Sequence, residues 1–119
     1  MAACRLIPKT DDSPFPYDEA MRLLIVDQPG MSFEPTDFEA LIAAGRKHGH
    51  WPESLVREHE EMEKRGKCFS FKLQNPPFLQ GTLYEDNVWF SFYSADHLKA
   101  CIPIIESLRE KLDVRIHQY

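Results

Sequence analysis

The spacing of apolar residues changes twice along this chain, and that change restricts the fold more than any other feature. Between residues 36 and 65 apolar side chains recur at helical spacing, from 67 to 93 they alternate with polar ones, and from 95 the helical spacing returns. A period of about 3.6 residues is typical of a helix with one buried face, and strict alternation is typical of a half-buried strand. We therefore expect helices, then strands, then another helix.

Two helices are expected in the middle of the chain. Thr36 and Glu39 have the spacing of a capping box, in which each side chain bonds the other's free backbone N–H. Gly49 suits the left-handed residue that ends a helix, and Pro52 suits the first turn of the next helix, over about 52–65. The stretch RKHGHWPES is therefore interpreted as a corner between two helices rather than as a metal or catalytic site.

The second of these helices carries many acidic residues, and a base follows three of them at a distance of four residues. Opposite charges at that spacing lie next to each other on a helix surface. We therefore interpret these residues as exposed ion pairs rather than as a binding site, and the expected pairs are Glu53 with Arg57, Glu60 with Lys64, and Glu61 with Arg65.

Strands and a last helix are expected in the second half of the chain. Alternation predicts three strands, the last two joined by a turn at Asp86–Asn87, and they lie at 67–73, 81–86 and 88–93. Ser94 suits the cap of a helix over about 95–111, which Pro103 should kink or restart. A final strand is expected over 113–119.

The first quarter of the chain has a less regular pattern. Residues 4–8 suit a short strand or an ordered arm, and residues 1–20 together suit an extended arm or loop. Residues 18–27 suit either a helix or a buried strand. The β-branched pair Ile25–Val26, with the turn residues that follow it, favours a strand at about 21–27.

The predicted fold is a single α+β domain that spans residues 1–119. Its order is strand, two helices, three strands, helix and strand (β-α-α-β-β-β-α-β), which suits a mostly antiparallel sheet with helices packed on one face. A chain of 119 residues buries enough surface to need neither disulfides nor metal. The three cysteines have no paired spacing, the longest apolar run is too short to cross a bilayer, and no secretory signal is expected. We therefore expect a cytoplasmic protein.

The negative charge is concentrated in one part of the chain. The net charge is −5, yet residues 11–39 alone hold eight acids against one base, Arg22. Such asymmetry bears on partners and on association rates rather than on the fold, and the alternative is a solvated surface that only confers solubility. Phosphates would be repelled, so DNA and RNA are not expected partners. The acids are Asp11, Asp12, Asp18, Glu19, Asp27, Glu34, Asp37 and Glu39.

Residues with catalytic or metal-binding chemistry are scattered along the chain. No spacing of histidines and cysteines matches a zinc site, so neither a metal nor a cofactor is expected. Cys101 falls on an apolar helix stripe and should be core, whereas Cys68 lies on a strand face with polar neighbours and could be accessible. His97 stands at a helix start beside Trp89 and Tyr93, where it is either a surface residue or a titrating group in a cleft.

The hairpin of strands at 81–93 has aromatic residues on both of its faces. Phe90 and Phe92 are expected in the core. Trp89, Tyr93 and Tyr84 share the opposite face. They form an exposed patch of the kind enriched at protein interfaces if no helix covers that face, and a second part of the core if one does.

The function that this pattern favours is binding without catalysis. Small inhibitors, including the immunity proteins that protect bacteria from toxins, are similar in size, acidity and lack of catalytic motifs. We expect an acidic protein that inhibits or neutralises a basic partner protein such as a toxin or effector, through charge pairs and aromatic anchors. No membrane partner is expected. The residues expected to bind the partner are Asp11, Asp12, Asp18, Asp27, Glu34 and Asp37, with Trp51 and Trp89 as anchors.

Two other functions remain open at this point. One is a small-molecule-binding domain or minor enzyme that uses His97 or Cys68 in a cleft. The other is a self-associating sheet module, a homodimer whose sheet edge or aromatic face forms the interface. Enzyme activity is thus an alternative to the binding function and is not the favoured one.

Overall fold

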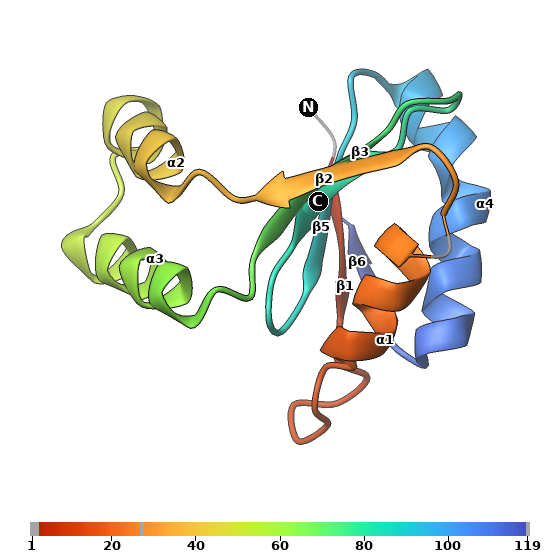
Figure 1. The fold of residues 1–119 in the computed structure, drawn as a ribbon, viewed down its shortest axis with the longest axis horizontal. Helices are drawn as coiled ribbons and strands as arrows, with labels where there is room; N and C mark the ends of the chain where they lie inside the picture. The colour runs from red at the N-terminus through yellow and green to blue at the C-terminus, as the bar shows by residue number, and fades with distance from the viewer. Residues whose placement is uncertain (1–2, 27, 119) are drawn as a thin grey trace.

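A six-stranded antiparallel sheet forms the centre of the molecule (Figure 1). The computed structural model describes residues 3–26 and 28–118. The strand order is β2-β3-β4-β5-β1-β6, and every neighbouring pair is antiparallel. This confirms the predicted α+β class. The strands are β1 (Ala3–Ile7), β2 (Met31–Pro35), β3 (Phe69–Leu73), β4 (Gln80–Leu83), β5 (Val88–Ser91) and β6 (Arg115–Gln118).

The helices follow the predicted order, with additions near the start. The expected succession of strand, two helices, three strands, helix and strand is present, and a short helix and strand β2 precede the first expected helix. Two helices continue into π-helical turns. The helical elements are α1 (Tyr17–Met21) with η1 (Arg22–Val26), α2 (Phe38–Ala44) with η2 (Gly45–Gly49), α3 (Glu53–Arg65) and α4 (Ala95–Leu112).

One face of the sheet is apolar and lies under α1, η1 and α4 (Figure 1). Alternation places one register row of side chains on this face, and the row runs through Phe33, Phe71, Gly81, Phe90 and Cys4. The part of this row from Phe71 to Cys4 is covered by α1, η1 and α4 and belongs to the core. Helix α4 contributes its own buried stripe to this core, namely Cys101, Ile105, Leu108 and Leu112.

The opposite face of the sheet is polar. The next register row runs through residues that alternate with the core positions, and α1 and α4 leave it uncovered. Trp89 is the large aromatic residue of this row, and the Arg5 guanidinium lies 5.1 Å from the centre of its ring. The whole row is Glu34, Ser70, Thr82, Trp89, Arg5 and His117.

Helices α2 and α3 form a hairpin that projects from the β2–β3 end of the sheet, away from α4 (Figure 1). We call residues 38–65 the helical arm. Its buried side chains, Phe38, Val56 and His59, stand apart from the main core. Trp51 folds back between the two helices, where its ring lies 4.6 Å from that of His59. A β-carbon on Gly45 would clash with the Trp51 ring, so a glycine is required there.

The prediction of a strand at about 21–27 was wrong. Residues 17–26 are helical, with Asp18 and Glu19 in the first turn, where acids favour the helix dipole. The apolar run looked like a strand because Leu24 and Ile25 are both buried against the main core. Asp27 lies outside the described residues. Strand β2, which the sequence analysis did not predict, follows directly.

The helix ends of the arm also differ from the prediction. The capping box is wrong, because Asp37 is the N-cap and its carboxylate accepts a hydrogen bond from the Ala40 N–H at 3.1 Å. Thr36 still belongs to the β2–β3 ladder, since its N–H donates to the Cys68 carbonyl. At the other end His50, not Gly49, adopts the left-handed conformation, with φ of 50°. The corner itself lies where it was expected.

Helix α4 runs without interruption through Pro103, so the helix does not restart there. Proline removes one backbone hydrogen bond to the carbonyl four residues earlier, here that of Lys99. Lys99 and Pro103 are both exposed, so water can satisfy that carbonyl. The cap at the start of α4 is confirmed: the Ser94 hydroxyl accepts from the His97 N–H at 3.1 Å.

Candidate functional site

His97 is held by the backbone on both sides of its ring. Its Nδ1 accepts a hydrogen bond from the Tyr93 N–H at 3.0 Å, so Nε2 carries the proton and donates to the Pro77 carbonyl at 2.8 Å. The ring also stacks on Tyr93, with 4.8 Å between ring centres. These contacts join the loop before α4 to the loop before β4. Both ring nitrogens of His97 are therefore engaged by backbone groups, which gives the residue a structural role.

The three cysteines are buried free thiols. Cys101 lies in the core as expected, but Cys68 does not have the expected accessibility, because it is covered at the base of the helical arm and only 4% exposed. Its Sγ donates to the Thr36 hydroxyl at 3.1 Å. Burial raises the pKa of the Cys68 thiol, an effect that this hydrogen bond partly offsets. A nucleophilic cysteine needs a lowered pKa and access to substrate, so Cys68 fits a structural role.

No metal centre is formed by the residues in the ranges 3–26 and 28–118. Within them, no three His, Cys, Asp or Glu side chains are placed to hold one ion. His48 and His50 flank the corner of the arm and both are exposed. The same described part of the chain has no helix that is long and apolar enough to span a bilayer.

The acids of residues 11–39 do not form one continuous surface. Asp11 and Asp12 lie in the loop at the lower end of Figure 1, and Asp18 begins α1 just above it. Glu34 lies on β2, and Asp37 lies at the start of α2, which is in the upper left part of the same view. The structure therefore divides these acids into a group near α1 and a group at the base of the helical arm.

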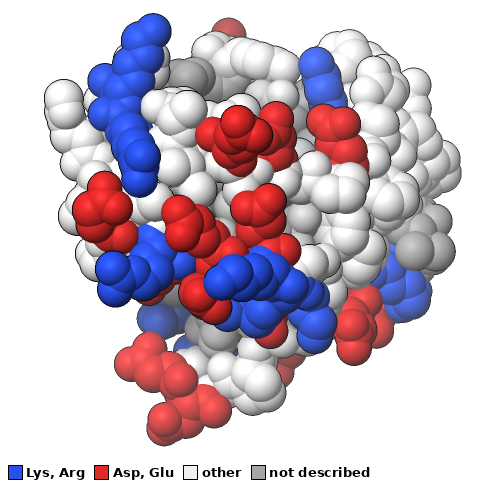
Figure 2. All heavy atoms as spheres, turned by 60° about the vertical axis from the view of Figure 1, so that its left-hand side comes forward, with Lys and Arg blue, Asp and Glu red and all other residues white. Residues whose placement is uncertain are grey.

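Several of these acids already have partners within the chain. Asp11 lies 3.8 Å from an Arg115 nitrogen, Glu19 forms an ion pair with Arg22, and Asp37 caps α2. Figure 2 shows acidic side chains in several separate groups, with lysines and arginines among those across the middle of the view. The acidic residues that are close together in the sequence are thus dispersed over the structure, and some of them have partners within the chain.

The two tryptophans expected as anchors are engaged within the fold. Trp51 is half-buried between Gly45 and His59 of the helical arm. Trp89 is half-buried on the polar face of the sheet, beside Arg5. Each ring therefore offers a partner only part of its surface.

The aromatic residues opposite the core do not form one exposed patch. Tyr93 is 59% exposed, and its hydroxyl donates to the Gln80 side chain at 3.0 Å. Tyr84 is half-buried, and burial is the main cause that raises the pKa of its hydroxyl to about 12. The question that the sequence left open therefore has a mixed answer, with Tyr93 in solvent and Tyr84 partly inside.

A hollow of about 600 Å³ lies between the two helices of the arm. We call it the arm hollow. Its volume falls within the range that is usual for ligand and side-chain pockets in proteins. Two apolar side chains, Ile42 and Ala43, come from α2, and carboxylates come from both helices. The residues that line the arm hollow are Glu39, Ile42, Ala43, Arg46, Glu60 and Glu63.

The carboxylates of the arm hollow have no ion pair within the described residues. The predicted pairs Glu60–Lys64 and Glu61–Arg65 do not form. Lys64 instead pairs with Glu61 at 3.4 Å, and Arg65 pairs with Glu85 of the β4–β5 turn at 2.5 Å. Long exposed side chains choose among several partners, so spacing alone does not decide them. Glu60 consequently borders the hollow without the predicted Lys64 contact.

The predicted pair of Glu53 with Arg57 is also absent. Glu53 instead pairs with Arg46 at 3.5 Å, across the corner between the helices. Arg46 is the basic residue that lines the arm hollow, and its guanidinium is engaged by the ion pair with Glu53. The arm hollow therefore combines three acids, one engaged base and two apolar side chains.

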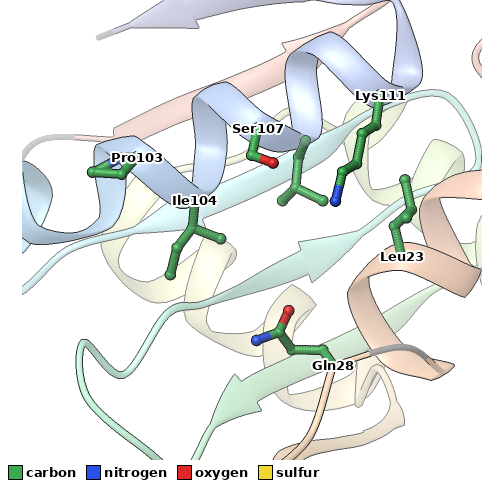
Figure 3. A pocket seen from close by; sticks show the side chains of 7 residues that line it. Leu23, Gln28, Pro103, Ile104, Ser107 and Lys111 are labelled. Atoms are coloured by element: carbon green, nitrogen blue, oxygen red, sulfur yellow. The ribbon is translucent and has the colours of Figure 1, made fainter.

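A second groove, of about 400 Å³, lies between the end of η1 and helix α4 (Figure 3). Leu23, Ile104 and Pro103 give it apolar walls, and Figure 3 shows the Lys111 side chain extending from α4 into it. The Gln28 amide lies on the opposite side. Its charged group is a cation, so this groove suits a basic partner less well than the arm hollow does.

The sequence analysis did not select Glu39, Glu60 or Glu63 as site residues. Glu39 was assigned to a capping box and Glu60 to a helix-surface pair. A signal was present, because Glu60 and Glu63 are three residues apart and thus lie on one face of α3. Residue spacing within α3 does not show that α2 packs near this face, because that contact belongs to the tertiary structure.

Comparison with known proteins adds no assignment. The chain matches no protein-family model, no curated protein and no solved structure.

Proposed function

We propose that this chain is a non-catalytic binding protein that inhibits or neutralises a basic partner protein, as an immunity-type inhibitor of a toxin or effector does. The helical arm is the binding element, and the arm hollow receives a lysine or arginine from the partner. The protein acts in the cytoplasm. Inhibition follows if the captured cation belongs to the partner's own active surface.

The observation that carries this proposal is the set of three carboxylates around the arm hollow. Glu39, Glu60 and Glu63 come from two helices and have no ion pair among the described residues, whereas most acids of α3's outer surface and of α4 do. A cation that enters the hollow would contact several carboxylates and lay its aliphatic stem on Ile42 and Ala43. Steering by the remaining negative charge would raise the association rate.

The same structure favours binding over the enzyme alternative. Both groups that chemistry would require, His97 and Cys68, are engaged by structural hydrogen bonds. Glu34 and Asp37 lie beside the arm, where they can extend the acidic surface. The group of Asp11, Asp12 and Asp18 lies elsewhere and contributes mainly to long-range attraction.

The test uses a fluorescein-labelled helical peptide of lysine and leucine, with a glutamate–leucine peptide of equal length as the negative probe. We expect the basic peptide to bind, and the triple variant Glu39→Gln, Glu60→Gln, Glu63→Gln to bind it about tenfold more weakly. That loss corresponds to about 0.5 kcal/mol for each exposed pair. Fluorescence anisotropy at several salt concentrations measures it.

The matched control removes three acids from the other group. Asp11→Asn, Asp12→Asn and Asp18→Asn change the net charge by the same amount, and we expect a loss of less than threefold, since distant charges are screened. Equal losses in the two triple variants would mean that only net charge matters, and they would contradict an arm-centred site. Full binding by the arm variant would contradict it as well.

A further inference from the structure

Strand β2 is an edge of the sheet with an uncovered outer side. Residues 32–35 are all exposed. The Gly30 carbonyl accepts from the Gln74 N–H at 2.9 Å, and the Thr36 N–H donates to the Cys68 carbonyl at 3.1 Å. Antiparallel ladders bond every second residue, so Ser32 and Glu34 also bond to β3. The backbone N–H and C=O groups of Phe33 therefore point outward from the edge, whereas the Met31 N–H already donates to the Gln28 carbonyl at 3.3 Å.

An exposed aromatic side chain lies at the middle of this edge. Phe33 is 49% exposed, although it lies on the apolar side of the sheet and contacts Phe69 edge-to-face, with ring centres 6.2 Å apart. Unpaired strand edges that carry apolar side chains are templates for pairing with another strand. Phe33 thus offers a second strand both unpaired backbone groups and an exposed aromatic side chain.

We propose that β2 pairs with β2 of a second copy of this chain, antiparallel, across a two-fold axis at Phe33. The two Phe33 residues then exchange both backbone hydrogen bonds. Pro35 has no N–H and the Met31 N–H is bonded within its own chain, so the two Phe33 bonds are the backbone bonds of this pairing. The two sheets join into one continuous sheet, and the Phe33 rings cover each other beside Phe69.

The side chains on the polar face are complementary in this register. Ser32 of one copy lies opposite Glu34 of the other, and Lys72 neighbours Ser32 on β3. Each Glu34 carboxylate therefore lies within reach of the other copy's Lys72, twice across the axis. A shift that centres the axis on Glu34 would set two carboxylates face to face, so charge favours the axis at Phe33.

Disulfide trapping tests the register. Mixing the Ser32→Cys variant with the Glu34→Cys variant under mild oxidation should give a disulfide-linked dimer, because these positions lie directly opposite each other. Neither variant alone should cross-link, since equal positions lie diagonally, about 7–8 Å apart. The native cysteines are buried and keep the background low. Cross-linking of Ser32→Cys alone would overturn the register.

Light scattering tests the dimer itself. We expect a concentration-dependent mass that approaches twice the 13.9 kDa of one chain. Phe33→Asp should abolish it, whereas Phe78→Asp, which changes another exposed phenylalanine in the loop between β3 and β4, should not. Circular dichroism confirms that both variants are folded. A wild-type mass of one chain at every concentration, or a dimer that survives Phe33→Asp, would overturn the proposal.

Discussion

Buried thiols are the residues whose chemistry the fold alters most. Cys4 is 0% exposed in strand β1, between β5 and β6, and Cys101 faces it from the core side of α4. Burial, with a smaller contribution from the charge that Cys101 would carry, raises the pKa of the Cys4 thiol from 9.0 to about 11. A thiolate in this core would have lost its hydration, so the native state retains a proton that the unfolded chain releases.

Stability should therefore decline in alkali through Cys4. The contribution of this thiol is complete below pH 9 and is lost as the pH rises toward 11, at up to about 1.4 kcal/mol per pH unit. Urea unfolding at a series of pH values measures the slope. The Cys4→Ala variant should be less stable at neutral pH but should lose stability less steeply between pH 9 and 11. Identical slopes would show that the thiol ionises equally in both states.

The helical arm is an element with a core of its own. Phe38, Val56 and His59 are buried in it, and none of them belongs to the main core. His59 donates its Nδ1 proton to the Leu55 carbonyl at 2.9 Å, which ties the ring to α3. An element held by so few buried side chains should open without the sheet.

Local opening can be measured with one substitution in each core. Val56→Ala should cost about 2 kcal/mol of arm stability, because it removes two buried methyl groups and leaves a cavity. In hydrogen exchange, amides of residues 38–65 should lose protection while those of β3, β4 and β5 keep theirs. Leu6→Ala should do the opposite, lowering protection in the sheet. Parallel losses throughout the chain in both variants would mean that arm and sheet unfold as one unit.

Elements with a strong local pattern were predictable from the sequence, and those set by tertiary contacts were not. The strands at 67–73 and 88–93 and the helix after Ser94 were found from alternation and capping, with ends shifted by a few residues. Residues 17–26 were misassigned because a helix buried on most sides shows the same apolar run as a buried strand. Strand β2 has only one half-buried side chain, Met31, so it carries no periodic signal.

The candidate site was less predictable than the fold. The excess of acidic residues in 11–39 was evident from the sequence. Their division into two groups depends on the positions of β2 and α2, which hold Glu34 and Asp37. The arm hollow depends on the packing of α2 against α3, which brings Glu39 near Glu60 and Glu63. Ion pairs between exposed side chains were the least predictable feature, since each acid has several bases within reach.

Considered as a whole, the molecule has different chemistry on its different sides. Helix α4 and α1 close one side, the polar sheet face carries Arg5 and Trp89, and the arm carries the unmatched carboxylates. A net charge of −5 attracts any basic protein at long range, whereas the arm hollow decides where a cation settles. Many acids thus share in the long-range attraction, whereas docking belongs to the arm.

Amide chemical-shift mapping with the lysine–leucine peptide distinguishes these two contributions in one experiment. We predict that the largest shifts fall in residues 39–46 and 56–63, that they saturate with peptide, and that they shrink in the Glu39→Gln, Glu60→Gln, Glu63→Gln variant. Shifts centred on residues 9–22, or spread evenly over every acidic residue, would contradict docking at the helical arm.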